Sequence, residues 1–361
     1  MVSPHDVFAE PALSRPPVTR AAYSDRMALL MAEMAKLAYL RFEDQPDSDR
    51  ERKDELDGVV KAIKDSEDQG GARDILATYV KEAPTAARER ARQDLKAELA
   101  RGGFKLCKTY AMGDTQAFLA VKEPGANAGP GEEGMAVLSF RGTEGIMDWK
   151  TNLNAYKEVV DGVPIHTGFL QAFRLVKTDI QADLDQLAGK EYALYLTGHS
   201  LGGALALVAT KEIARASIGA CYTFGSPRVA GIGFAQKIKT PIYRVVNARD
   251  IVPRVPQVFL PAVLSTIVSV TPIPYQKWIS KGLEKFAGYV HHGDMRYLTR
   301  TKKERSYRYE DVKLLSNPNM VYRAMWWFRG IWRKPWSPIN DHSIDIYCKK
   351  LKAYALQRIN I

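Results

Sequence analysis

Apolar and polar positions divide the chain into a helical first part and an alternating second part. Between residues 22 and 42, apolar side chains recur every three or four positions, which predicts a helix with a core-facing stripe. Ser24 or Asp25 is placed to cap its start. Residues 45–101 are highly charged, with helical character and breaks at a Gly-Gly pair and a proline. We interpret them as a helical addition with one solvated side, and alternatively as a partner-binding module.

From Gly103 onward, short apolar runs alternate with helical segments. The pattern predicts strands at 104–110, 116–121, 135–140, 192–197, 219–224 and 243–246, and helices at 168–187 and 201–216. This alternation favours an α/β fold with a mostly parallel sheet covered on both faces. We therefore expect an N-terminal arm and helical addition over residues 1–103 and a catalytic domain over residues 104–361, with functional residues at the carboxyl ends of strands.

Composition narrows the class of protein. An apolar content of 46% and an aromatic content of 10% are typical of a globular chain. The three cysteines lie far apart, so we expect neither a disulfide framework nor a zinc site, and no metal or cofactor. The start of the chain lacks the apolar run of a signal peptide, and no apolar stretch is long enough to span a bilayer. We expect a cytoplasmic protein, or one exported without a cleaved signal peptide.

The positive charge is concentrated at the C-terminal end. Residues 277–361 hold 18 of the 52 Lys and Arg residues but 7 of the 41 acidic ones. Within the C-terminal segment 320–361, residues 321–336 hold four of the six tryptophans, interleaved with basic residues. Tryptophan and arginine together favour a bilayer interface, so we expect peripheral contact with an anionic membrane. The alternative is a buried aromatic cluster with snorkelling arginines. Nucleic-acid binding is not expected, because no nucleic-acid motif accompanies the charge.

The sharpest chemical signal is the sequence GHSLGG at residues 198–203, between an apolar strand and a helix. A serine on so tight a turn needs neighbours without bulk, which Gly198 and Gly202 provide. Its hydroxyl is then presented as a nucleophile, and the backbone N–H of Leu201 can donate to an oxyanion. The pattern predicts Ser200 as the nucleophile of a hydrolase.

Two further signals lie at strand ends. Gly142-Thr143 follows the strand at 135–140 and can present a backbone N–H and a hydroxyl to the same pocket, as the second half of an oxyanion hole. Asp250 follows the strand at 243–246 and lies downstream of Ser200, in the chain order of a hydrolase triad. A carboxylate there can orient the histidine that acts as base. A capped turn remains the alternative at both places.

Five motifs together resemble the class 3 lipase family, which includes fungal triacylglycerol lipases. They are FRGTEGIMDWKTNL (140–153), HTGF (166–169), GHSLGGALA (198–206), TFGSPRVAG (223–231) and RVVNARDIVPRVP (244–256), in the family's order. The resemblance covers residues 104 to 300 and implies an α/β-hydrolase fold. It also implies Ser200 as nucleophile, Asp250 as triad acid, Thr143 and Leu201 as the oxyanion hole, and a structural role for His199.

The histidine base has three candidates, because it must follow Asp250 in the chain. Residues 289–293 read YVHHG and resemble the family's Tyr-x-His-x-Gly signature, which points to His291. His292 and His342 are the alternatives. His342 stands at the start of the helix that is expected to end the chain, where it is also typical of a capping cluster.

The resemblance implies hydrolysis of lipid esters: triacylglycerols, phospholipids or simpler carboxylic esters. The fungal lid is reduced here, since 16 residues separate Trp149 from His166, and residues 258–287 are a candidate replacement cap. A soluble short-chain carboxylesterase and a catalytically silent interaction protein of the same fold remain alternatives, as does a toxin-like phospholipase. The sequence does not indicate an oligomeric state.

Overall fold

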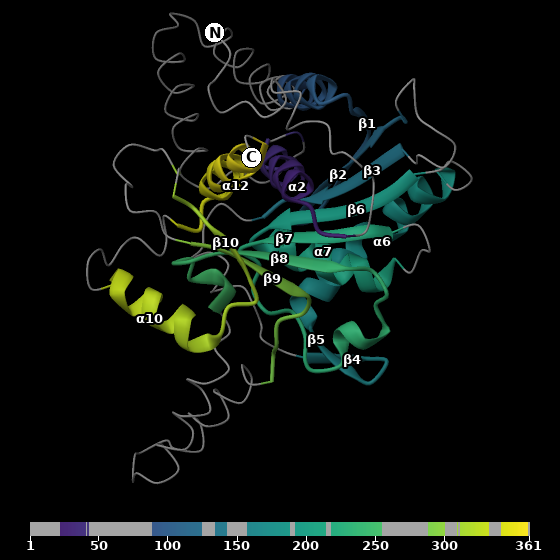
Figure 1. The fold of residues 1–361 in the computed structure, drawn as a ribbon. Helices are drawn as coiled ribbons and strands as arrows, with labels where there is room; N and C mark the ends of the chain where they lie inside the picture. The colour runs from purple at the N-terminus through teal and green to yellow at the C-terminus, as the bar shows by residue number, and fades with distance from the viewer. Residues whose placement is uncertain are drawn as a thin grey trace, which may run out of the picture.

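An eight-stranded sheet forms the centre of the protein (Figure 1). In this computed structural model, the described residues are 22–40, 42, 89–124, 134–142, 157–187, 192–213, 218–254, 288–299, 309, 311–331 and 341–359. The strands of the sheet are β1 (Lys105–Met112), β2 (Thr115–Lys122), β3 (Gly134–Phe140), β6 (Tyr192–His199), β7 (Ile218–Phe224), β8 (Ile242–Asn247), β9 (Asp294–Leu298) and β10 (Leu314–Ser316).

Strand direction separates the middle of the sheet from its edges. The order is β1-β2-β3-β6-β7-β8-β9-β10, and the strands from β3 to β9 run parallel. The edge pairs β1–β2, β2–β3 and β9–β10 are antiparallel. Strands β3, β6 and β8 are buried along their whole length, as expected for parallel strands covered on both faces. The predicted α/β-hydrolase fold is confirmed.

Helices cover the two faces of the sheet in pairs. Helices α2 (Asp25–Leu37) and α12 (Ile344–Ile359) lie side by side on one face, and α6 (Thr167–Gln186) and α7 (Leu201–Glu212) lie on the other (Figure 1). Because side chains alternate along a strand, neighbouring residues serve opposite cores: Val137 packs under α2, whereas Leu138 packs under α7. None of the described helices combines the length and apolar character needed to cross a bilayer.

Helix α2 belongs to the core of the hydrolase fold, although the sequence grouped it with the N-terminal addition. Its methionine stripe is buried as predicted, and Ser24 caps its start by accepting from the backbone N–H of Met27 at 3.4 Å. The hydroxyls of Ser139 and Thr197, on β3 and β6, donate to backbone carbonyls of α2 at 3.0 Å. The predicted boundary at residue 103 therefore assigns α2 and the sheet to different parts of the chain, although the two pack against each other. Most of the charged stretch 45–101 lies outside the described residues; residues 89–101 are helical.

Several elements were not predicted from the pattern. The hairpin of β4 (Lys157–Val160) and β5 (Val163–His166) and the strands β9 and β10 are too short for a clear period. Helix α10 (Met320–Ile331) lies apart from the helices that cover the sheet (Figure 1). It occupies part of the aromatic and basic segment that the sequence singled out.

Candidate active site

Ser200 lies on a strained turn between β6 and α7. Its backbone has φ 56° and ψ −124°, a combination that L side chains rarely adopt. Its N–H donates to the carbonyl of Phe224 at 2.9 Å, which ties the turn to β7. A Cβ added at Gly198 would lie 2.2 Å from the carbonyl oxygen of Gly202, so strand and helix approach as the sequence predicted. Strain of this kind holds a nucleophile's hydroxyl away from the backbone.

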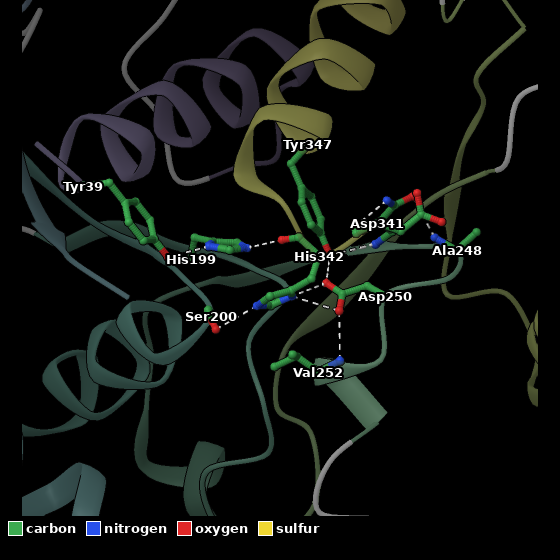
Figure 2. A network of polar contacts seen from close by, with 10 residues as sticks. Tyr39, His199, Ser200, Ala248, Asp250, Val252, Asp341, His342 and Tyr347 are labelled. Carbon is green, nitrogen blue, oxygen red and sulfur yellow. Dashed lines mark hydrogen bonds and ion pairs between the residues drawn. The ribbon is translucent and has the colours of Figure 1, made fainter. Parts of the chain in front are cut away.

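Ser200, His342 and Asp250 form a hydrogen-bonded chain (Figure 2). His342 Nε2 lies 2.8 Å from Ser200 Oγ, and Nδ1 lies 2.9 and 2.8 Å from the two carboxylate oxygens of Asp250. An ionised carboxylate only accepts hydrogen bonds, so Nδ1 carries the proton and Nε2 is free to accept from the serine hydroxyl. All three residues are buried. This arrangement can transfer the hydroxyl proton to the imidazole.

The histidine that the family signature favoured is not part of this chain, and the interpretation of His291 as base is wrong for this structure. His291 Nε2 instead bonds the carbonyl of Pro253 at 2.5 Å, and its side chain is half-buried. The alternative His292 bonds the carbonyl of Ala230 at 3.3 Å. The reason lies in strand direction. His291 precedes β9 and enters the sheet at the amino end of that strand, whereas Ser200 and Asp250 follow the carboxyl ends of β6 and β8.

Tyr347, a residue that sequence reasoning missed, holds the carboxylate of Asp250. Its hydroxyl donates to Asp250 Oδ2 at 2.6 Å, while the N–H of Val252 donates to Oδ1 at 2.9 Å. Burial, followed by the charge of Asp250, raises the pKa of the Tyr347 phenol, so it remains a donor. Both carboxylate oxygens are thus engaged. The available signal was a tyrosine on the helix that follows a candidate base.

The neighbouring histidine positions the loop that carries His342. His199 Nε2 lies 2.6 Å from the carbonyl oxygen of His342, and Nδ1 lies 2.7 Å from the hydroxyl of Tyr39 (Figure 2). A carbonyl only accepts, so Nε2 carries the proton and Nδ1 accepts from Tyr39. Burial lowers the pKa of His199, which keeps the ring neutral and this pattern intact. The family's structural role for His199 agrees with these contacts.

Ion pairing and amide contacts join the loops that carry the base and the acid. Arg249, beside Asp250, is buried, and its Nε lies 3.8 Å from a carboxylate oxygen of Asp341. The side-chain amide of Asn247 donates to the backbone carbonyl of Asp341 at 2.8 Å. Asp341, the residue before His342, is therefore held through both its side chain and its backbone.

The oxyanion hole is described only in part. Leu201 is the first residue of α7, where backbone N–H groups have no helical acceptor. A Cβ at Gly202 would lie 2.2 Å from the carbonyl oxygen of Phe140, so the end of β3 abuts the start of α7. Thr143 lies outside the described residues, as does the candidate cap at 258–287, so both stay predictions. Within the described ranges, no three His, Cys, Asp or Glu side chains gather as metal ligands would.

Buried histidines predict acid sensitivity of the fold. The pKa values of His166, His199, His291 and His292 are all lowered by burial, that of His166 to about 4. In the unfolded chain these groups titrate near pH 6.5, so below that pH the unfolded state binds more protons. We expect the free energy of unfolding to fall as the pH drops from 6.5 to 5, by up to about 1.4 kcal/mol per pH unit for each histidine. Urea denaturation at several pH values measures this slope, which His199→Gln should reduce. A stability that is flat between pH 7 and 5 would contradict the expectation.

Comparison with known proteins finds a family that part of the chain resembles. Residues 137–260 match the family described as "Lipase (class 3)". The chain is 37% identical over 131 residues to a secreted mono- and diacylglycerol lipase of Fusarium solani, and 34% identical over 172 residues to a lipase of Rhizomucor miehei. The residues matched by the family, 137–260, include both Ser200 and Asp250. Over residues 137–260, the chain is similar to the class 3 lipase family.

The similarity covers only part of this chain and of its relatives. The Fusarium match spans 34% of this chain and 39% of the relative; the Rhizomucor match spans 42% and 44%. A chloroplastic phospholipase A(1) of Arabidopsis thaliana is 28% identical over 177 residues, which is 41% of this chain and 40% of the relative. The chain thus spans less than half the length of these curated relatives. Among solved structures, a Rhizomucor miehei lipase propeptide complex aligns with a TM-score of 0.42 at 28% identity, over 56% of this chain and 59% of that one.

Proposed function

We propose that this chain is a serine hydrolase that cleaves carboxylic ester bonds of lipids through an acyl-enzyme. The observation that carries the proposal is the hydrogen-bonded chain from the strained Ser200 through His342 to Asp250. A nucleophile, a base within 2.8 Å of it and a carboxylate that orients the base are the parts that acyl transfer requires.

The reaction follows from the proton positions. His342 Nε2 takes the hydroxyl proton as Ser200 Oγ attacks the ester carbonyl carbon. The positive imidazolium is stabilised by Asp250, and the tetrahedral oxyanion is stabilised by the N–H of Leu201 and by Thr143. Collapse breaks the ester C–O bond, and Nε2 returns the proton to the leaving alcohol oxygen. A water molecule, deprotonated in turn by His342, then releases the fatty acid.

The names of the relatives support a lipid as substrate. They comprise lipases, a mono- and diacylglycerol lipase and a phospholipase A(1). The test is analysis of the products formed from mixed phospholipid and triacylglycerol vesicles. A chain-length series of p-nitrophenyl esters addresses the short-chain alternative, which a sharp optimum at about two to four carbons would favour. Failure of a fluorophosphonate to label Ser200 would instead favour a silent interaction protein.

Peripheral contact with an anionic membrane is the second part of the proposal, and helix α10 supports it. Met320, Val321 and Met325 of this helix are 56%, 77% and 45% exposed. Tyr322 contacts the rings of Trp326 and Tyr297, which joins this helix to β9. Large apolar side chains exposed together on a helix in a basic segment suit the interface of an anionic bilayer.

Flotation with liposomes tests this contact. We expect recovery with anionic vesicles that falls with salt, and about tenfold weaker binding for Val321→Asp, because a buried valine contributes about 1.5 kcal/mol and the new charge is repelled. Ile232→Asp is the matched control, since Ile232 is 80% exposed and is not part of α10. Equal, salt-independent recovery with neutral vesicles would contradict contact with an anionic membrane. An equal loss of vesicle binding in Ile232→Asp would contradict the role of α10.

A further inference from the structure

Four arginines from separate elements gather beside the loop that carries Asp250. Arg228 follows the end of β7, Arg244 lies in β8, Arg254 ends the short helix η2 (Val252–Arg254), and Arg323 lies in α10. Arg228 Nη1 donates to the backbone carbonyl of Arg254 at 2.9 Å. Arg323 Nη1 lies 3.7 Å from the sulfur of Met295, which is the register partner of Arg244 on β9. These contacts join Arg228 to Arg254 and place Arg323 beside the register partner of Arg244, and the charges of Arg323 and Arg228 both act on Arg244.

The centre of the cluster is buried without a described counter-charge. Arg244 is 9% exposed, its Nε is buried without a hydrogen bond, and it makes no ion pair with any residue that the structure describes. Arg323 also makes no ion pair with any of the described residues, and its Nε is buried without a hydrogen bond. By contrast, the buried Arg249 pairs with Asp341. A buried guanidinium without an anion is costly, so the site favours a bound negative group.

The arginines also act on one another. Burial, then the charges of Arg323 and Arg228, lowers the pKa of Arg244 to about 9. Burial, then Arg323 and Arg254, lowers the pKa of Arg228 to about 10. Asp250 attracts Arg254, but both of its oxygens are already bound by His342, Tyr347 and the N–H of Val252. The guanidinium groups therefore remain charged at neutral pH, and their repulsion is relieved by an anion that several of them can share.

We propose that Arg228, Arg244, Arg254 and Arg323 form a binding site for a phosphate group beside the candidate triad. Forked guanidinium donors match the oxygens of a phosphate, which carries enough charge to be shared by several arginines. Arg254 Nη2 lies 3.5 Å from the backbone carbonyl oxygen of Ala248, two residues before Asp250, so the cluster adjoins the loop that carries the triad acid. The phosphate belongs either to the headgroup of a glycerophospholipid substrate, which rests on the proposed function, or to free inorganic phosphate.

Binding of inorganic phosphate tests the site without catalysis. We expect phosphate to raise the melting temperature of the full chain more than chloride at equal ionic strength, and Ser200→Ala to respond in the same way. Arg323→Gln should weaken phosphate binding at least about tenfold, the equivalent of about 1.4 kcal/mol. Without phosphate, it should melt no lower than the wild type, because one like charge leaves the cluster. Arg174→Gln, which removes an exposed arginine paired with Glu158, is the control. Equal effects of phosphate and chloride, or an unchanged affinity in Arg323→Gln, would overturn the site.

Substrate selectivity distinguishes the two sources of phosphate. A short-chain phosphatidylcholine and a diacylglycerol with the same acyl chains, both used as monomers, are compared by kcat/KM. If a headgroup binds, Arg323→Gln lowers the ratio of phosphatidylcholine to diacylglycerol hydrolysis about tenfold, and Arg174→Gln leaves the ratio unchanged. If phosphate binds but the ratio is unchanged, the ligand is free phosphate and the headgroup assignment is wrong. If phosphate binds but neither lipid is cleaved, the proposed function fails while the site stands.

Discussion

Replacement of Ser200 by alanine is expected to reduce the rate of ester hydrolysis by about a millionfold, close to the uncatalysed background. The variant keeps the loop and the oxyanion donors but has no nucleophile, so no acyl-enzyme forms. The strained backbone at this position, with φ 56°, favours no side chain in particular, so alanine should be accommodated as well as serine. Release of fatty acid from phospholipid and triacylglycerol vesicles, measured beside the wild type, gives the ratio directly.

Ser226→Ala is the matched control for this variant. Ser226 is also buried and lies against the start of α7, but its hydroxyl bonds only a backbone carbonyl among the described partners, that of Pro227 at 3.2 Å. Its loss should leave the rate within about tenfold of the wild type, because a neutral hydrogen bond contributes about 1 kcal/mol. If Ser200→Ala retained a tenth of the wild-type rate, the proposed function would be wrong.

The second large effect distinguishes two histidines. We expect His342→Ala to lose about as much activity as Ser200→Ala, because nucleophile and base act as one unit and their losses are not additive. His291→Ala should keep a rate within about tenfold of the wild type, since its ring bonds the carbonyl of Pro253 at 2.5 Å rather than the nucleophile. The double variant Ser200→Ala/His342→Ala should be no slower than either single one.

Stability must be measured alongside these rates. His291 is half-buried and bonds the carbonyl of Pro253, so its replacement removes packing and a hydrogen bond and is expected to lower the melting temperature. Rates are therefore compared well below the melting temperature of each variant, with Ser200→Ala as the background. The assignment of the base fails if His291→Ala is as inactive as Ser200→Ala while His342→Ala keeps its activity.

Local features of the chain were sufficient to predict the nucleophile and the acid. Glycines at 198 and 202 around Ser200, placed between an apolar strand and a helix, can form only a narrow range of turns. Asp250 follows a β-branched strand directly. Both predictions depend on a few neighbouring residues, and the sheet then places the carboxyl ends of β6 and β8 at one edge.

The base could not be predicted in the same way, because its place depends on how the chain returns to the sheet. Three histidines follow Asp250, and a short signature does not reveal that His291 enters at the amino end of β9. The path of the chain through β10 and α10 brings His342 back to the triad from 92 residues beyond Asp250.

By itself, the sequence determined the class of fold, the strand–turn–helix around Ser200 and the carboxylate at Asp250, since these follow from local periodicity and turn chemistry. Only the tertiary structure decided that α2 and α12, from opposite ends of the chain, pack side by side and bring Tyr39 and Tyr347 to the site. It also decided that the four arginines at 228, 244, 254 and 323 form one cluster. Such contacts depend on the packing of distant segments, which no short pattern of residues encodes.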